Sequence, residues 1–125
     1  MNLLLDTHII LWWLDNNSKL PEYYKNLISD NMNLCFVSSA SIWEISIKVS
    51  IGKLVIPANY LTLLKEQDFR ELLINWEHAD LVLNLPMNHR DPFDRILIAQ
   101  CIIEDYTFLT VDKIFKTYDL KIMNY

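Results

Sequence analysis

The fold is decided by one stretch late in the chain, Asp91-Pro92-Phe93-Asp94-Arg95-Ile96-Leu97-Ile98-Ala99-Gln100, which continues apolar as far as Ile103. Proline is favoured at the first position of a helix, so this stretch predicts a helix over residues 92–104. Apart from Arg95 and Gln100, the helix is apolar on nearly every side. A helix of that kind is typically buried, here against a sheet.

Short apolar runs alternate with helical patterns along the rest of the chain. The expected strands are residues 3–5, 34–38, 108–111 and 121–123, with 69–74 as a weaker fifth. The expected helices are 7–14, capped by Thr7, 21–28, a helix capped by Ser39 or Ser41 and ending near 49, 57–66, 76–83 and 92–104. This alternation predicts a central, mainly parallel sheet with helices on both faces, a three-layer α/β/α sandwich.

The composition fits one folded domain over residues 1–125. The chain has one glycine, 52% hydrophobic residues and a net charge of -5. Disordered chains are less hydrophobic, and collagen-like chains contain far more glycine. Roughly two thirds of the unfolded surface is buried in a domain of this size, enough for a core without disulfides or zinc. No linker or repeat interrupts the sequence.

The two cysteines and the N-terminus indicate a reducing compartment. Cys35 and Cys101 lie in apolar runs and are expected to be buried, free thiols. The N-terminus lacks the basic region of a signal peptide. No apolar stretch reaches the roughly 18 residues of a membrane span. We therefore expect a cytoplasmic protein.

Four acidic residues are expected at one edge of the sheet. Asp6 and Asp112 directly follow two strand runs, and Glu44 and Asp94 lie in apolar helices. In open α/β sheets, sites form outside the carboxyl ends of the strands. Like charges a few ångströms apart repel by about 1 kcal/mol in water and by several-fold more in a partly buried site. Such a cluster indicates a bound cation.

The ligand types narrow the choice of cation. Oxygen ligands with no His or Cys at zinc spacing favour Mg²⁺ or Mn²⁺. Removing these four acids from the 16 acidic residues leaves 12, against 11 basic residues. The remaining surface is therefore near neutral, and the excess negative charge is concentrated at the predicted site.

Each acid also has a purely structural interpretation. Asp6 could cap the helix that follows it, and Asp112 could cap a short helix over 113–118. Glu44 could be solvated or could pair with Lys48 at i+4. The joint placement of the acids is what favours the metal site.

Asp91 is a different case. Asp91 and Asp94 are spaced three apart around Pro92, which resembles a capping box. We assign Asp91 to the cap and Asp94 to the metal.

Three blocks of the sequence resemble the PIN-domain family, and most closely its toxin ribonucleases of the VapC type. They are Leu3-Leu4-Leu5-Asp6-Thr7-His8, then Val37-Ser38-Ser39-Ala40-Ser41-Ile42-Trp43-Glu44-Ile45-Ser46-Ile47-Lys48, and finally His89 to Gln100 together with Leu109-Thr110-Val111-Asp112. In this order the blocks span nearly the whole chain.

The resemblance implies an acidic pocket that binds Mg²⁺ or Mn²⁺ and cuts single-stranded or looped RNA, often tRNA or ribosomal RNA. The catalytic and metal-binding quartet of the family falls on Asp6, Glu44, Asp94 and Asp112. Thr110 and Asp91 would support it. The resemblance also implies a homodimer and an antitoxin whose C-terminal segment lies along a groove of the toxin, often placing a basic side chain in the pocket.

The expected reaction is hydrolysis of a phosphodiester. A metal lowers the pKa of its bound water toward neutrality, and that water attacks phosphorus in line, leaving a 5′-phosphate and a 3′-hydroxyl. Because an acidic pocket repels RNA, basic residues must contact the phosphates. Arg95 and Lys48 are the best candidates, followed by Arg90 and Lys53.

Three other functions are open at this point. A metal-free ribonuclease could use a histidine pair drawn from His8, His78 and His89, but their spacing does not bring two together. A phospho-acceptor receiver domain also gathers aspartates at strand ends, but the expected central aspartate and late lysine are missing. The third is a catalytically silent RNA- or protein-binding module on the same PIN-like fold.

Overall fold

The computed structural model describes residues 1–124, and Tyr125, the last residue of the predicted domain, lies outside them. Along the chain the elements are β1 (Asn2–Leu5), α1 (Thr7–Leu14), α2 (Glu22–Ser29), β2 (Leu34–Ser38), α3 (Ser39–Ser50), α4 (Tyr60–Glu66), β3 (Arg70–Leu72), α5 (Trp76–Leu81), the 3₁₀ helix η1 (Val82–Asn84), α6 (Pro92–Glu104), β4 (Thr107–Leu109) and the 3₁₀ helix η2 (Lys113–Thr117).

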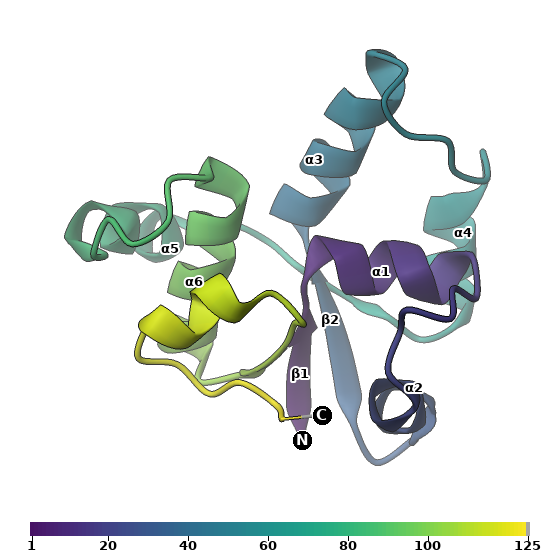
Figure 1. Ribbon diagram of the computed structural model, residues 1–125, viewed down its shortest axis with the longest axis horizontal. Coiled ribbons are helices and arrows are strands. Elements are labelled where there is room, and N and C mark those ends of the chain that lie inside the picture. The colour runs from purple at the N-terminus through teal and green to yellow at the C-terminus, as the bar shows by residue number, and fades with distance from the viewer. Residues whose placement is uncertain (125) are drawn as a thin grey trace.

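The four strands form one parallel sheet in the order β3-β2-β1-β4. β1 is central, and its Leu4 lies opposite Phe36 of β2 and Phe108 of β4. Parallel neighbours need crossover connections, and helices supply them on both faces of the sheet (Figure 1). The predicted three-layer α/β/α sandwich is confirmed.

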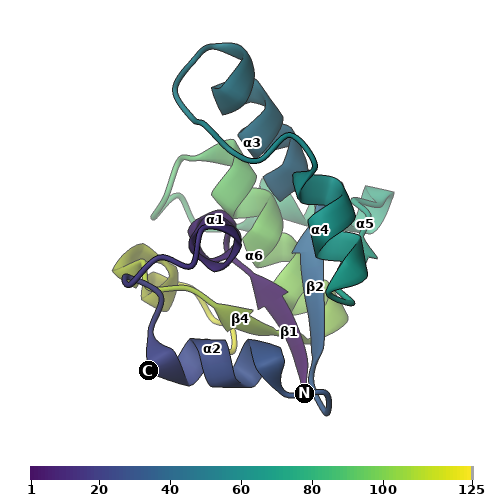
Figure 2. The same cartoon turned by 90° about the vertical axis from the view of Figure 1, so that its right-hand side faces the viewer.

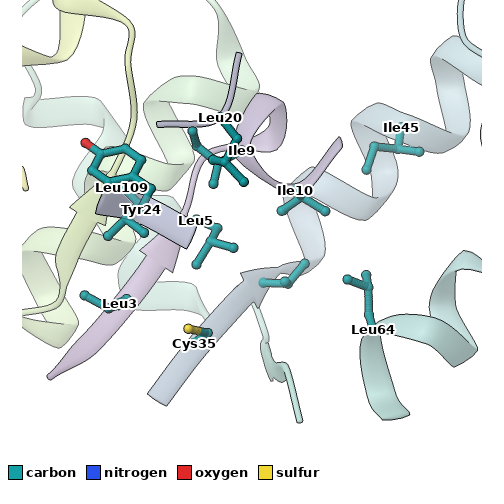
Figure 3. Close-up of a cluster of buried hydrophobic side chains, with 11 residues drawn as sticks. Leu3, Leu5, Ile9, Ile10, Leu20, Tyr24, Cys35, Ile45, Leu64 and Leu109 are labelled. Carbon is teal, nitrogen blue, oxygen red and sulfur yellow. The ribbon is translucent and has the colours of Figure 1, made fainter. Parts of the chain in front are cut away.

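Alternate side chains of β1 point into two different cores. Leu3 and Leu5 join a cluster with side chains of α1, α2, α3 and α4 (Figure 3), whereas Leu4 joins a cluster with α6 and η2. Figure 2 shows α1 and α2 on one side of the strands and α6 on the other. Because β1 is covered on both faces, the residue that directly follows it lies in the interior of the domain.

The helix over 92–104 begins and ends where the sequence predicts. Its residues from Leu97 to Cys101 are buried against the sheet, including the polar Gln100. Ile102 and Ile103 at its far end are about 40% exposed, so its burial is less complete than the apolar sequence indicates.

Two strand predictions near the C-terminus are wrong in extent. β4 ends at Leu109 because the chain turns there, with the Asp112 N–H donating to the Thr110 hydroxyl. The predicted strand over 121–123 is a single bridge between Phe108 and Ile122 at the open edge of β4.

Three helix boundaries also differ from the prediction. The helix expected from Pro57 begins at Tyr60, because Pro57 is used in a turn that its carbonyl closes with the Tyr60 N–H. The helix expected over 76–83 ends at Leu81 and tightens into η1. The cap of α3 is Ser38, whose hydroxyl accepts from the Ala40 N–H.

Both cysteines are free and buried, as predicted, and they lie in different cores. Burial raises the pKa of the Cys35 thiol to about 11, so it stays protonated at neutral pH. Within residues 1–124, no helix is both long enough and apolar enough to cross a membrane.

Candidate active site

The carboxyl edge of the sheet carries the four acids. Asp6 directly follows β1 and is 4% exposed. Asp112 follows β4 and caps η2, with its Oδ1 accepting from the Ile114 N–H at 3.1 Å. Glu44 lies on α3, which follows β2 without a break, and Asp94 lies in the first turn of α6.

Asp6 is oriented by a neighbouring strand and not by the helix it precedes. Its side chain makes no capping bond to α1. Instead the Thr110 hydroxyl donates to Asp6 Oδ2 at 2.8 Å. Burial raises the pKa of Asp6, and the charge of Asp112 acts in the same direction, while Thr110 and His8 oppose both. Asp6 is thus a desolvated carboxyl with one fixed oxygen.

Asp94 has a partner that the sequence analysis did not identify. His89 Nε2 lies 2.6 Å from Asp94 Oδ2. Burial raises the pKa of Asp94 to about 7, and the charges of Asp6 and Asp91 add to the rise, whereas His89 lowers it. The only sequence signal for this contact is the cap. The Asp91 carboxylate accepts from the Asp94 N–H at 3.0 Å, which turns the preceding loop back over the first turn of α6.

Glu44 is buried and only half satisfied. Its Oε2 accepts from Lys48 Nζ at 3.1 Å. This is the Glu44–Lys48 ion pair that the sequence analysis gave as an alternative. Its Oε1 is buried and has no hydrogen-bond partner among the residues that the structure describes. A buried carboxylate oxygen without a partner costs free energy. This atom is therefore a natural ligand for a cation.

Two contacts hold α3 against the other elements of the site. The Thr7 hydroxyl at the start of α1 donates to the Ser41 hydroxyl at 3.0 Å, and both are buried. The rings of Trp43 and Phe93 meet edge to face, with centroids 5.3 Å apart. Glu44 follows both α3 residues, so these contacts fix it beside the starts of α1 and α6.

The prediction that Arg95 contacts RNA phosphate is wrong, because its side chain is buried and hydrogen-bonded to the backbone. Arg95 is 6% exposed and faces the loop before α6. Its terminal guanidinium nitrogens donate to the backbone carbonyls of Val82, Leu85, Pro86 and His89 at 2.8 to 3.3 Å. These bonds satisfy four carbonyls at once. Arg95 is thus a structural residue that holds the loop bearing His89.

The other predicted phosphate contacts remain at the surface. Lys48 is 40% exposed in its side chain while it pairs with Glu44. Arg90 and Lys53 are exposed.

The three histidines have separate partners. His8 stacks on Trp12, His78 lies 2.9 Å from Glu104, and His89 pairs with Asp94. This arrangement argues against the histidine-pair ribonuclease.

The donor set fits a hard divalent cation. Asp6, Asp94 and Asp112 are close enough for the charge of one to raise the pKa of another, and Glu44 adds an unpaired oxygen. Over residues 1–124, no three His, Cys, Asp or Glu side chains form a ready-made ligand set. A cation would have to draw the carboxylates inward against their mutual repulsion.

A comparison with models of protein families identifies the family of the chain. The model of the PIN domain matches residues 3–121, so the chain belongs to the PIN-domain family. A comparison with the sequences of curated proteins gave no significant match.

Solved structures with the same fold are similar to nearly the whole chain. One is VapBC2 from Rickettsia felis bound to a promoter DNA fragment, with 21% identity over 99% of this chain and 98% of that chain and a TM-score of 0.73. Another is FitAcB from Neisseria gonorrhoeae, with 19% identity over 98% and 96% and a TM-score of 0.67. A third is FitAB bound to an IR36 DNA fragment, with 17% identity over 98% and 94% and a TM-score of 0.65.

Replacing Arg95 is expected to loosen the loop before α6. Arg95→Met removes four hydrogen bonds and leaves the carbonyls of Leu85 and His89 without a donor among the described residues, so it should lower the free energy of unfolding by about 3 kcal/mol, measured by urea denaturation. The control is Arg90→Met, at an exposed position, which should change it by less than about 0.5 kcal/mol. Equal and small effects of both variants would contradict the structural role of Arg95.

The raised pKa of Asp94 gives the metal-free protein a pH-dependent stability. Its folded-state pKa of about 7 lies above the ordinary value of 3.8, so between these values the folded state keeps a proton that the unfolded state has released. The contribution of Asp94 to the free energy of unfolding is therefore fully present below about pH 4 and is lost as pH rises toward 7. Asp94→Asn should be more stable than the unsubstituted protein at pH 8 by about 2 kcal/mol.

The measurement is urea unfolding at pH 5 and pH 8 in EDTA. The advantage of Asp94→Asn should shrink at pH 5. The control Asp119→Asn removes an exposed acid and should show no such pH dependence. An advantage that is constant with pH would show that the carboxyl of Asp94 is not held in its protonated form by burial.

Proposed function

We propose that the protein is an endoribonuclease dependent on Mg²⁺ or Mn²⁺ and that it acts as the toxin of a toxin–antitoxin pair. The observation that carries the proposal is the buried, unpaired Oε1 of Glu44 at the edge where burial raises the pKa values of Asp6 and Asp94. Carboxyls held this way need a proton or a cation. Membership of the PIN-domain family supports the cation.

The residues that would hold the cation are Asp6, Glu44, Asp94 and Asp112. When bound, the cation supplies an acidified water as nucleophile and neutralises charge on the phosphate. The chain's own contribution is to orient these oxygens. Thr110 fixes Asp6, and Lys48 neutralises Glu44 until a ligand replaces it.

The His89–Asp94 contact gives the site a place for a proton. The 2.6 Å separation of His89 Nε2 and Asp94 Oδ2 lets the two groups share one. Asp94 binds a cation only without its own proton, so transfer to His89 would prepare Asp94 as a ligand. The His89 and Phe115 rings are nearly perpendicular, with centroids 6.0 Å apart, and this contact restricts the orientation of His89.

The nuclease proposal is tested by incubating total RNA with the protein, with Mg²⁺ or Mn²⁺ or with EDTA. We expect cleavage only with the metal, at 5′-phosphate ends, and a loss of at least about 100-fold in Asp6→Asn and Asp94→Asn. Asp119→Asn is the control and should keep full activity. Mapping the ends would show whether tRNA, another structured RNA or single-stranded RNA is the substrate.

Three results would count against the nuclease. Equal cleavage by the variants or in EDTA would indicate a contaminant. Products with 2′,3′-cyclic phosphate would indicate histidine chemistry. Binding of RNA without cleavage under any metal condition would indicate a silent binding module on the same fold.

The antitoxin proposal rests on a groove and on the structural relatives. Solved structures with this fold include the VapBC2 and FitAcB complexes. An apolar groove of about 230 Å³ lies between α3, α4 and β3, with Ile42, Leu61, Leu64 and Phe69 in its lining. α3 carries both this groove and Glu44. Ile42 and Glu44 lie on different faces of α3, so a partner segment in the groove would have to continue around α3 to bring a basic side chain to the acids. The homodimer stays a prediction.

Leu61→Glu tests the groove. Leu61 is 44% exposed, so the charge should leave the fold and the cleavage activity intact but weaken binding of the small antitoxin encoded nearby by at least about 10-fold. The control is Leu83→Glu on η1, which is 81% exposed and outside the groove lining. Binding is measured by calorimetry with the two purified proteins. Equal affinity for both variants, or an active protein indifferent to that partner, would contradict the proposal.

A further inference from the structure

Trp43 is a large aromatic side chain that is 62% exposed. It lies on α3 directly before Glu44, which is buried. Single exposed apolar residues are common on protein surfaces and need no explanation by themselves. The position of Trp43 beside the acidic site is what requires one.

The Trp43 ring is held in place and keeps an open face. Its centroid is 5.3 Å from that of Phe93, and the two planes meet at 79°. In an edge-to-face contact, each ring covers at most one face of the other. Phe93 therefore leaves at least one face of the Trp43 indole uncovered. The large exposure of Trp43 places that face in solvent.

The two rings of the aromatic pair belong to residues that directly precede two of the acids. Trp43 adjoins Glu44 in sequence, and Phe93 adjoins Asp94, so each ring belongs to a residue whose Cα is about 3.8 Å from that of an acid. The Trp43–Phe93 contact joins the second turn of α3 to the first turn of α6. A phosphate held at the acids would carry its neighbouring base to this rim.

We propose that the open face of Trp43, oriented by Phe93, stacks an unpaired nucleobase next to the phosphate held at the acidic site. The inference rests on the proposed nuclease function and names the residue that positions its substrate. Trp43 contacts the base, and Phe93 acts through Trp43.

The charges of the site favour a contact that does not depend on positive charge. The protein carries a net charge of -5, and the buried guanidinium of Arg95 is engaged by backbone carbonyls. Lys48 is engaged by Glu44. Of the predicted phosphate contacts, Arg90 and Lys53 are exposed. Stacking on an aromatic ring needs no charge and would add to any attraction that they provide. Stacking of a single base on an aromatic ring is strong enough to change affinity by several-fold or more.

Trp76 provides a matched control for Trp43. It is 90% exposed at the start of α5. His78, two residues later, contacts Glu104 at the last position of α6, whereas Asp94 is in its first turn. Ten residues of helix separate Asp94 from Glu104, or about 15 Å. A base bound at the acidic site would not reach Trp76.

The experiment measures binding of a short, fluorescently labelled, single-stranded RNA by anisotropy, with Mg²⁺, on the Asp94→Asn background to prevent cleavage. A second RNA of the same length carries abasic sites in place of its bases. Trp43→Ala should bind the first RNA about 5- to 100-fold more weakly and the abasic RNA unchanged. Trp43→Phe should stay within a few-fold of the parent, and Trp76→Ala should equal it.

A second variant separates stacking from packing. Trp43→Leu keeps an apolar contact with Phe93 but has no aromatic face, so it should lose affinity as Trp43→Ala does while unfolding at the same urea concentration as the parent. On the active background, Trp43→Ala should raise KM more than it lowers kcat.

Two results would overturn the inference alone. In the first, the protein cleaves RNA and Trp43→Ala and Trp43→Leu bind like the parent. In the second, both variants lose equal affinity for the base-bearing and the abasic RNA. A protein that neither binds nor cleaves RNA with either metal overturns the proposed function, and this inference with it.

Discussion

The burial of Asp6 at the end of β1 is the constraint on which the rest of the site depends. β1 is the second strand from one edge of a parallel sheet, and both of its faces are covered by packed side chains. The chain leaves it directly into α1, so the carboxyl of Asp6 cannot reach bulk solvent. A charge in that place costs free energy unless neighbours oppose it. The hydrogen bond from the Thr110 hydroxyl offsets part of this cost. A proton or a cation bound to Asp6 would offset the rest.

The other acids repeat this conflict on neighbouring elements. Asp94 contacts His89 at 2.6 Å, and Glu44 accepts from Lys48 with one oxygen while the other has no partner among the described residues. Each arrangement is poorer for stability than an apolar side chain would be. Proteins keep such arrangements at functional sites, where stability is lost in return for chemistry. The metal-free domain is thus held together by its two cores, against a destabilising edge that a ligand would relieve.

The sequence predicts the frame of this protein well, because its signals are local. Proline and an apolar run define α6, and strand ends followed by Asp place Asp6 and Asp112 at one edge. What failed depends on the paths of loops and turns, which no hydrophobic periodicity in the sequence predicts. The carbonyls that engage Arg95 belong to a loop whose path is set by η1, and the edge at 121–123 pairs only with Phe108. The His89–Asp94 contact arises from the turn that the Asp91 cap imposes.

Arg95 and Trp43 show how burial reverses roles assigned from residue type. An arginine beside an acid is expected at the surface for phosphate, and a tryptophan in an apolar helix is expected in the core. In the fold the arginine is 6% exposed and the tryptophan 62%. The guanidinium is buried because it donates to four carbonyls of this loop, and two of them, those of Leu85 and His89, have no other hydrogen-bond donor among the described residues. Beside the acids, the fold therefore exposes an aromatic side chain and buries an arginine.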